Sequence, residues 1–122
     1  MPEETGRRLA EYATEHVGGA LRAVVVIYQD SIEIIYLSDK LATSYSREAF
    51  TRIADSFRDQ LGDHRNTSQD SPLGSKHCFI HHYENAFIFQ FPHEDCHSIL
   101  MSVEPQVGSN LDRFVRECKH YL

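Results

Sequence analysis

Two amphipathic patterns mark helices near the start and in the middle of the chain. The first covers residues 2–17, opens with Pro2 and two glutamates, and ends at Gly18-Gly19. The second begins after Ser46, a residue type that caps helix N-termini, and ends at Gly62. Its apolar positions share one helix face and are Phe50, Ile53, Ala54, Phe57 and Leu61. Each pattern predicts a helix that buries one face.

Runs of apolar residues of strand length predict a sheet. Leu21 to Tyr28 and Ile32 to Leu37 are separated only by Gln29-Asp30-Ser31, which indicates a hairpin. The first run is apolar on both faces and is expected in the centre of the sheet, whereas the second carries Glu33 and is expected nearer an edge. Three further runs predict an antiparallel meander: His77 to Tyr83, Ala86 to Phe91 and Ser98 to Val103.

Three other segments complete the order of elements. Asp39 to Ser44 is too polar for a strand and lacks glycine and proline, so it predicts a short turn of helix. Residues 63–75 have hardly an apolar anchor and are expected to form a mobile loop, either functional or simply disordered. Pro105 suits the first turn of a C-terminal helix. The apolar residues of that helix have the spacing of one buried stripe: Val107, Leu111, Phe114, Val115, Cys118 and Leu122.

The order α-ββ-α-βββ-α predicts a single α+β domain over residues 1–122, with a five-stranded antiparallel sheet and helices on both faces. A chain of 122 residues is long enough to bury one core. This order resembles the roadblock/LC7 type of profilin-like fold, with PAS-like or GAF-like sensor domains as the alternative. The resemblance concerns the fold, and a fold does not establish a function.

Composition restricts the setting and the partners. Hydrophobic residues make up 41% of the chain, and its longest apolar runs are far shorter than a bilayer span. The start, Met1-Pro2-Glu3-Glu4, is acidic where a secretory leader is basic, so we expect a cytoplasmic protein. Three cysteines without CxxC spacing are expected to be free thiols. A net charge of -6 offers no basic surface, so neither nucleic acid nor a membrane is expected as a partner.

The balance of charged residues points to a type of source organism. Acidic residues number 18 against 12 basic ones, and arginine far outnumbers lysine. A salt-loving source explains this skew, and so does the codon bias of a GC-rich genome. Several segments are similar to a small family of haloarchaeal proteins of unknown function: Tyr36 to Ser46, Phe87 to His93, Val103 to Pro105 and Phe114 to Cys118. The resemblance implies salt adaptation and supplies no catalytic residues.

Histidines and cysteines gather in and beside the predicted meander, and both are good zinc ligands. The most compact set is His93, Cys96 and His97 in the turn between the fourth and fifth strands, and these three are the candidate metal ligands. Their spacing matches no standard zinc signature. The alternative is that Pro92 to His97 is a polar hairpin turn and that the strand histidines lie partly exposed at an edge.

The chain shows no catalytic constellation. Cys96 beside His97 is the only candidate pair of nucleophile and base in the sequence. Adjacent residues of an extended strand point to opposite sides, however, so this pair is not expected to act together. Cys78 and Cys118 are expected to be small buried hydrophobes. We therefore expect a non-enzymatic interaction or regulatory module that forms a homodimer or binds a protein partner. A small-ligand or zinc-binding sensor that uses the meander histidines and Cys96 is the second hypothesis, and a cysteine- or metal-dependent hydrolase the third.

Overall fold

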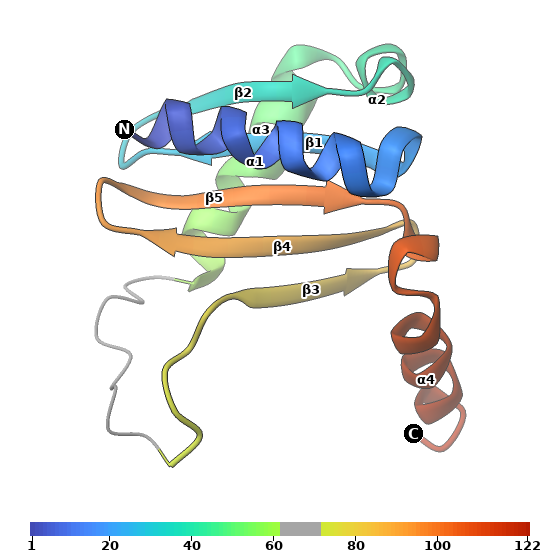
Figure 1. Cartoon of the computed structure of the whole chain (residues 1–122). Helices are drawn as coiled ribbons and strands as arrows, with labels where there is room; N and C mark the ends of the chain where they lie inside the picture. The colour runs from blue at the N-terminus through green and yellow to red at the C-terminus, as the bar shows by residue number, and fades with distance from the viewer. Residues whose placement is uncertain (62–71) are drawn as a thin grey trace.

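A computed structural model describes residues 1–61 and 72–122. Along these residues the main elements are α1 (Pro2–Val17), β1 (Leu21–Ile27), β2 (Ile32–Leu37), α2 (Asp39–Ser44), α3 (Arg47–Leu61), β3 (Phe79–Tyr83), β4 (Ala86–His93), β5 (Cys96–Val103) and α4 (Ser109–Lys119) (Figure 1). Short 3-10 helices, η1 (Gly18–Ala20) and η2 (Pro105–Gly108), precede β1 and α4. The predicted element order is confirmed, including the short helix at α2.

The described strands form one five-stranded sheet in the order β2-β1-β5-β4-β3, and every neighbouring pair is antiparallel. β1 lies between β2 and β5 and is buried at almost every position, so its predicted central place is confirmed. β2 lies at an edge, as the charged residue in its sequence indicated. No helix in the described part of the chain is long and apolar enough to cross a membrane.

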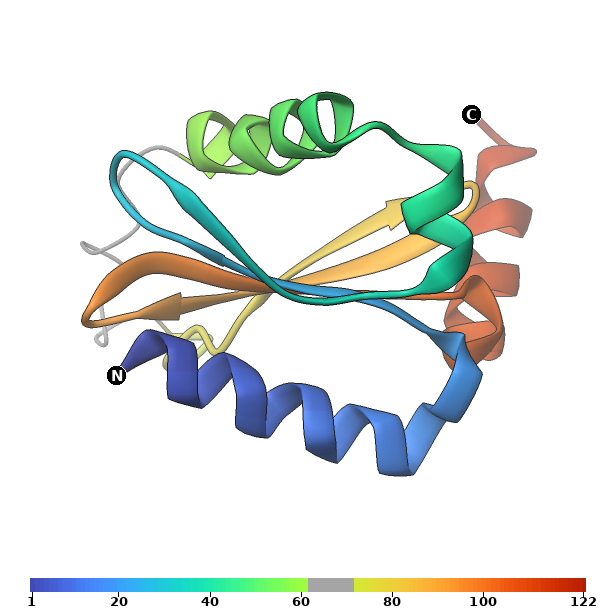
Figure 2. The same cartoon turned by 90° about the horizontal axis from the view of Figure 1, so that it is seen from above.

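Helices cover both faces of the sheet, as predicted (Figure 2). α1 packs on β1 and β2, where a Cβ atom on Gly6 would lie 3.1 Å from side-chain atoms of Ile35 and Val26. This close approach leaves little room for a larger residue at position 6. The buried cluster on the α1 side consists of Ala10, Ala13, Leu21, Val24, Val26, Phe87, Cys96, Ile99 and Val103.

α3 covers the opposite face of the sheet. Its start is capped by Ser46, whose Oγ accepts a hydrogen bond from the Ala49 amide at 3.1 Å, which confirms the predicted N-cap. Further along, the Arg58 guanidinium donates to the carbonyls of Tyr28 and Ser31 and ties α3 to the β1–β2 turn. The buried cluster on this side consists of Ala23, Val25, Ile27, Leu41, Ala54, Phe57 and Leu100.

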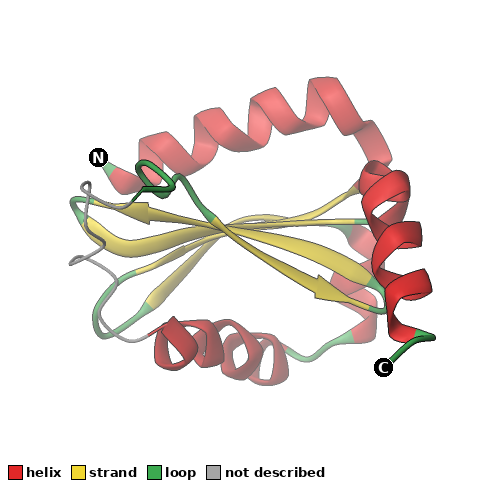
Figure 3. Ribbon diagram, turned by 90° about the horizontal axis from the view of Figure 1, so that it is seen from below, coloured by secondary structure: helices red, strands yellow, loops and turns green. Residues whose placement is uncertain are grey.

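The predicted burial of the α4 stripe is wrong. α4 runs past the end of the sheet beside the β3–β4 turn, and none of its residues is buried (Figure 3). Leu111 is 45% exposed and Phe114 64% exposed. Helical periodicity shows that a helix has an apolar face, but it does not show what covers that face. Cys118 on α4 is likewise exposed.

The region before β3 also differs from the expectation. The mobile loop predicted over residues 63–75 lies mostly outside the described residues. β3 begins at Phe79 rather than at His77. Cys78, just before the strand, is only half-buried, so its predicted burial is wrong.

Candidate functional site in a cavity beneath α3

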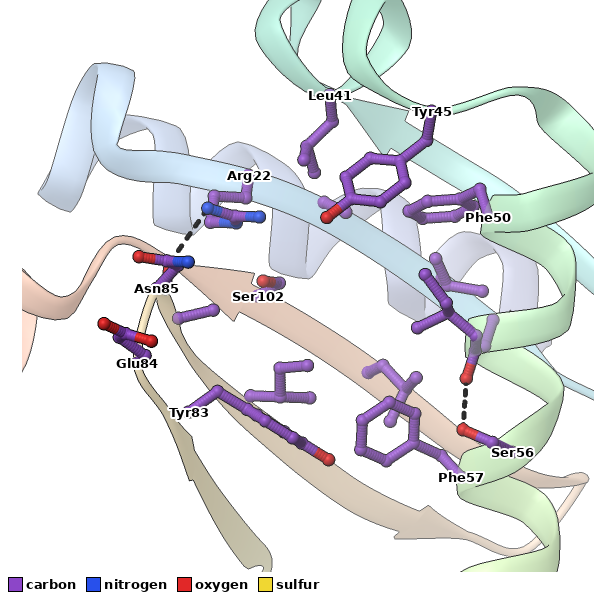
Figure 4. Close-up of a pocket in the computed structure, with 17 residues that line it drawn as sticks. Arg22, Leu41, Tyr45, Phe50, Ser56, Phe57, Tyr83, Glu84, Asn85 and Ser102 are labelled. Carbon is purple, nitrogen blue, oxygen red and sulfur yellow. Dashed lines mark hydrogen bonds between the residues drawn. The ribbon is translucent and has the colours of Figure 1, made fainter.

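A cavity of about 480 Å³ lies between α3 and the sheet (Figure 4). Side chains of β1, β4 and β5 line it from the sheet, among them Val25, Ile88 and Leu100. α3 contributes Phe50, Ile53 and Phe57. This size falls within the range of about 300–1,000 Å³ that is typical of small-molecule sites, and the lining is mostly apolar.

Small side chains explain why the interior is open here. Ala23 of β1, Ala54 of α3, Ala86 of β4 and Ser102 of β5 all line the cavity. These small side chains leave a hollow of about 480 Å³ between α3 and the sheet. It is open to solvent at its rim, where Tyr45, Ile53 and Tyr83 are each more than 40% exposed.

Polar groups gather at one end of the cavity. The Arg22 guanidinium, the Tyr45 hydroxyl and the Ser102 hydroxyl all lie at this end (Figure 4). Arg22 Nη1 donates to the Asn85 carbonyl oxygen at 2.9 Å. A second hollow of about 360 Å³ adjoins this end, shares Arg22, Tyr45 and Asn85 with the cavity, and adds Lys40 and Glu104. The cavity is thus apolar over most of its lining and polar at its Arg22 end.

A buried polar network lies beyond the cavity on the same face of the sheet. The Gln90 amide nitrogen donates to Ser98 Oγ at 2.9 Å and to the Phe57 carbonyl oxygen at 3.4 Å. The Gln90 carbonyl oxygen lies 3.0 Å from His81 Nε2, and Ser98 Oγ lies 2.9 Å from His97 Nδ1. With this amide orientation, His81 donates from Nε2 to the Gln90 carbonyl oxygen, and the tautomer of His97 sets which group donates in its contact with Ser98. The network satisfies Gln90 and Ser98, which are both fully buried.

The candidate zinc ligands are engaged in other contacts. His93 Nδ1 accepts a hydrogen bond from the Asp95 amide, and Cys96 is buried in the cluster on the α1 side. His97 contacts Ser98 instead. Across the described residues, no group of three or more His, Cys, Asp or Glu side chains is placed to hold a metal ion. The zinc site at His93, Cys96 and His97 stays a prediction for metal analysis of the purified protein.

Three charged or titratable side chains hold α4 against the β3–β4 hairpin. Asp112 lies 2.6 Å from His82 Nε2 and 2.9 Å from Arg116 Nε. Arg116 also donates to the Glu84 carbonyl oxygen at 3.0 Å. The hydrogen bond from Arg116, followed by that from His82, lowers the pKa of the Asp112 carboxyl below its ordinary value of 3.8. Asp112 therefore remains a carboxylate at neutral pH and can accept both bonds.

Sequence reasoning missed both the cavity and the Gln90 network. One signal for the network was present, because Gln90 interrupts the apolar run of β4 from Ala86 to Phe91. Arg22 gave a similar signal within the apolar run of β1. A polar residue inside a central strand needs a partner when it is buried, so such positions indicate a site.

Comparison with protein-family models shows the family to which the chain belongs. A family model described as "Domain of unknown function (DUF7522)" matches residues 7–122. The chain belongs to this family. The DUF7522 match spans every strand that the structure describes, the residues that line the cavity, and α4. Comparisons with curated proteins and with solved structures give no match.

Proposed function

We propose that this DUF7522 chain is a non-enzymatic regulatory module that binds a small, largely apolar molecule in the cavity beneath α3. The single observation that carries the proposal is the cavity of about 480 Å³, with its apolar lining and polar groups at one end. Binding sites for small molecules typically combine a hydrophobic lining with a few orienting polar groups. The site differs from the histidine and cysteine cluster expected for a sensor.

The chemistry of the lining supports binding over catalysis. The described lining residues include no histidine or cysteine, and their one carboxylate is Glu84. The Ser56 hydroxyl donates to the Ile53 carbonyl oxygen at 2.6 Å within its own helix. A serine nucleophile needs an adjacent base, and none accompanies Ser56 or Ser102 in this lining.

Filling the cavity should weaken binding and leave the fold intact. Ser102 lies on β5 and faces the cavity, so the ring in Ser102→Phe can occupy space that a ligand would use. We expect binding to weaken by at least about tenfold, which corresponds to about 1.4 kcal/mol. The measurement is a thermal-shift screen with medium-chain acids and alcohols, followed by calorimetric titration of the hits.

The matched control is Ser75→Phe, which adds the same ring at an exposed position before β3. This variant should bind as the wild type does. Equal binding by Ser102→Phe and Ser75→Phe would place any ligand outside the cavity. No binding of any small molecule by the wild type would count against the proposed function itself.

A second candidate function is self-association, and the exposed face of α4 favours it. Leu111 and Phe114 point an apolar stripe away from the chain's own core. Among the described residues, no helix covers the middle of the α1 side of β3 and β4 (Figure 1), and Ile80 there is 52% exposed beside its cross-strand neighbour Phe89. We propose that a second copy of the chain covers both surfaces.

A twofold dimer fits these two surfaces because each copy supplies one of each. α4 of one copy would lie on the bare sheet face of its partner, and the same contact would form a second time by symmetry. Such an arrangement buries two apolar surfaces per chain at once. A stable interface needs about 800 Å² per partner, which is more than a single short helix stripe provides.

The dimer is tested by placing a charge in the stripe. We expect wild-type protein at micromolar concentration to have the mass of a dimer in light scattering, and Phe114→Glu to have that of a monomer, because a buried unpaired carboxylate is strongly unfavourable. Tyr12→Glu, at an exposed position on α1, is the control and should remain dimeric. A monomeric wild type would refute the dimer and leave the ligand proposal untouched.

The fold family, the source organism and the cellular compartment of this protein are also proposals. The element order supports a roadblock/LC7-type or profilin-like relationship, with PAS-like and GAF-like domains as alternatives. The excess of acidic residues and the similar segments support a haloarchaeal source. Three cysteines without CxxC spacing support a reducing, cytoplasmic setting. A haloarchaeal protein should unfold at a higher temperature in molar salt than in dilute buffer, because salt screens the repulsion between its acidic residues.

A further inference from the structure

Arg22 is directed toward the cavity by an irregularity in β1. Leu21 pairs with Val103 and Ala23 with Ser102, so Arg22 is the extra residue of a β-bulge opposite β5. Bulges change the direction of a side chain and are common beside functional sites. The Arg22 side chain is 14% exposed and lines both the cavity and the adjoining hollow.

The guanidinium of Arg22 does not use all of its N–H donors in hydrogen bonds among the described residues. Nη1 donates to the Asn85 carbonyl oxygen at 2.9 Å, and its distance of 3.7 Å from Glu104 is too long for a hydrogen bond. Nε is buried and has no hydrogen-bond partner among the described residues. A buried donor without a partner is unfavourable, so a small rotation of the side chain that brings Nε to an acceptor in the cavity would be favourable.

The other groups at this end suit an acceptor as well. The hydroxyls of Tyr45 and Ser102 face the same space and can each donate one hydrogen bond (Figure 4). The charged neighbours are Lys40 and Glu104, 4.0 Å apart, and the Glu84 carboxylate. Together with Arg22, these make two positive and two negative charges that cancel, so recognition would depend on the paired donors of the guanidinium edge rather than on net charge.

We propose that the ligand is an amphipathic carboxylic acid, a deepening of the proposed function that rests on it. The carboxylate accepts hydrogen bonds from Nε and the neighbouring Nη2 of Arg22, the two-pronged geometry that arginine and carboxylates form together. The apolar body lies against Phe50, Ile53 and Leu100 beneath α3. The ligand then buries its apolar body against the lining while its carboxylate is hydrogen-bonded by Arg22.

The test compares three ligands that share one apolar chain: octanoate, octan-1-ol and octylamine. Calorimetric titration of the wild type should show octanoate binding about tenfold or more tightly than octanol, because charge-assisted hydrogen bonds are the stronger kind. Octylamine should bind most weakly. Arg22→Gln should reduce octanoate affinity to that of octanol and leave octanol unchanged, while Arg22→Lys should restore only part of the difference.

Glu104→Gln provides a second variant that leaves Arg22 in place. Removing this nearby carboxylate should tighten octanoate binding and leave octanol binding unchanged, and unchanged or weaker octanoate binding would oppose the proposal. Equal affinity of the wild type for octanoate and octanol, with both lost in Ser102→Phe, would overturn the carboxylate and keep the proposed function. Failure of all three ligands and of the wider screen would overturn both.

Discussion

Replacing Phe87 with alanine should lower the free energy of unfolding by about 3–5 kcal/mol, the usual cost of truncating a buried phenylalanine. Phe87 is 1% exposed and belongs to the buried cluster on the α1 side. Its ring also lies 4.7 Å from the His82 ring, and a Cβ atom on Gly108 would lie 3.1 Å from it. The truncation therefore removes core contacts together with the surface against which η2 packs.

The measurement is urea unfolding followed by circular dichroism, which reports the whole transition of a small domain. Phe114→Ala is the matched control because it removes the same ring from an exposed position. In protein dilute enough to be monomeric, this control should change stability by no more than about 0.5 kcal/mol. A loss below about 1 kcal/mol for Phe87→Ala would contradict the packing described for β4.

Replacing Gln90 with leucine should lower the free energy of unfolding by about 1–3 kcal/mol, even though leucine is of similar size. The loss has one main cause, because Ser98 Oγ and His81 Nε2 would both lose the amide that they contact. A buried polar group left without its partner retains the full penalty of its desolvation. The measurement is again urea unfolding.

The double variant Gln90→Leu/Ser98→Ala separates this cause from a change in packing. Removing both hydrogen-bonding partners is much less unfavourable than removing one, so the double variant should be more stable than the sum of the two single variants predicts. Strict additivity would show that the 2.9 Å contact between Gln90 and Ser98 contributes nothing to stability. It would also weaken the case for the network as a structural unit.

Much of the fold could be predicted because it depends on local geometry. Ser46 caps α3 by accepting a hydrogen bond from the amide of Ala49, only three residues away. The start of the helix is therefore determined by residues that are close together in the sequence. The valines of β1 are apolar on both faces, which indicated a strand covered from both sides. Such patterns of period 2 and 3.6 reflect how successive side chains leave a strand or a helix.

The candidate site could not be predicted in the same way. Ala23, Ala54 and Ser102 come from three elements far apart in the chain, and each is an ordinary small residue within its own element. Only their meeting beneath α3 leaves a cavity. The candidate metal ligands His93, Cys96 and His97 are instead near neighbours in sequence, and in the structure they contact different groups.

The sequence by itself thus determined the element order, the central place of β1 and the amphipathic character of α4. The tertiary structure alone decided that α3 leaves a cavity over the sheet, that the β-bulge turns Arg22 toward it, and that the apolar face of α4 lies outside the core. The physical reason is that periodicity reports which face of an element is apolar. Which faces meet depends on the packing of distant segments, where the volumes of opposing side chains either match or leave space.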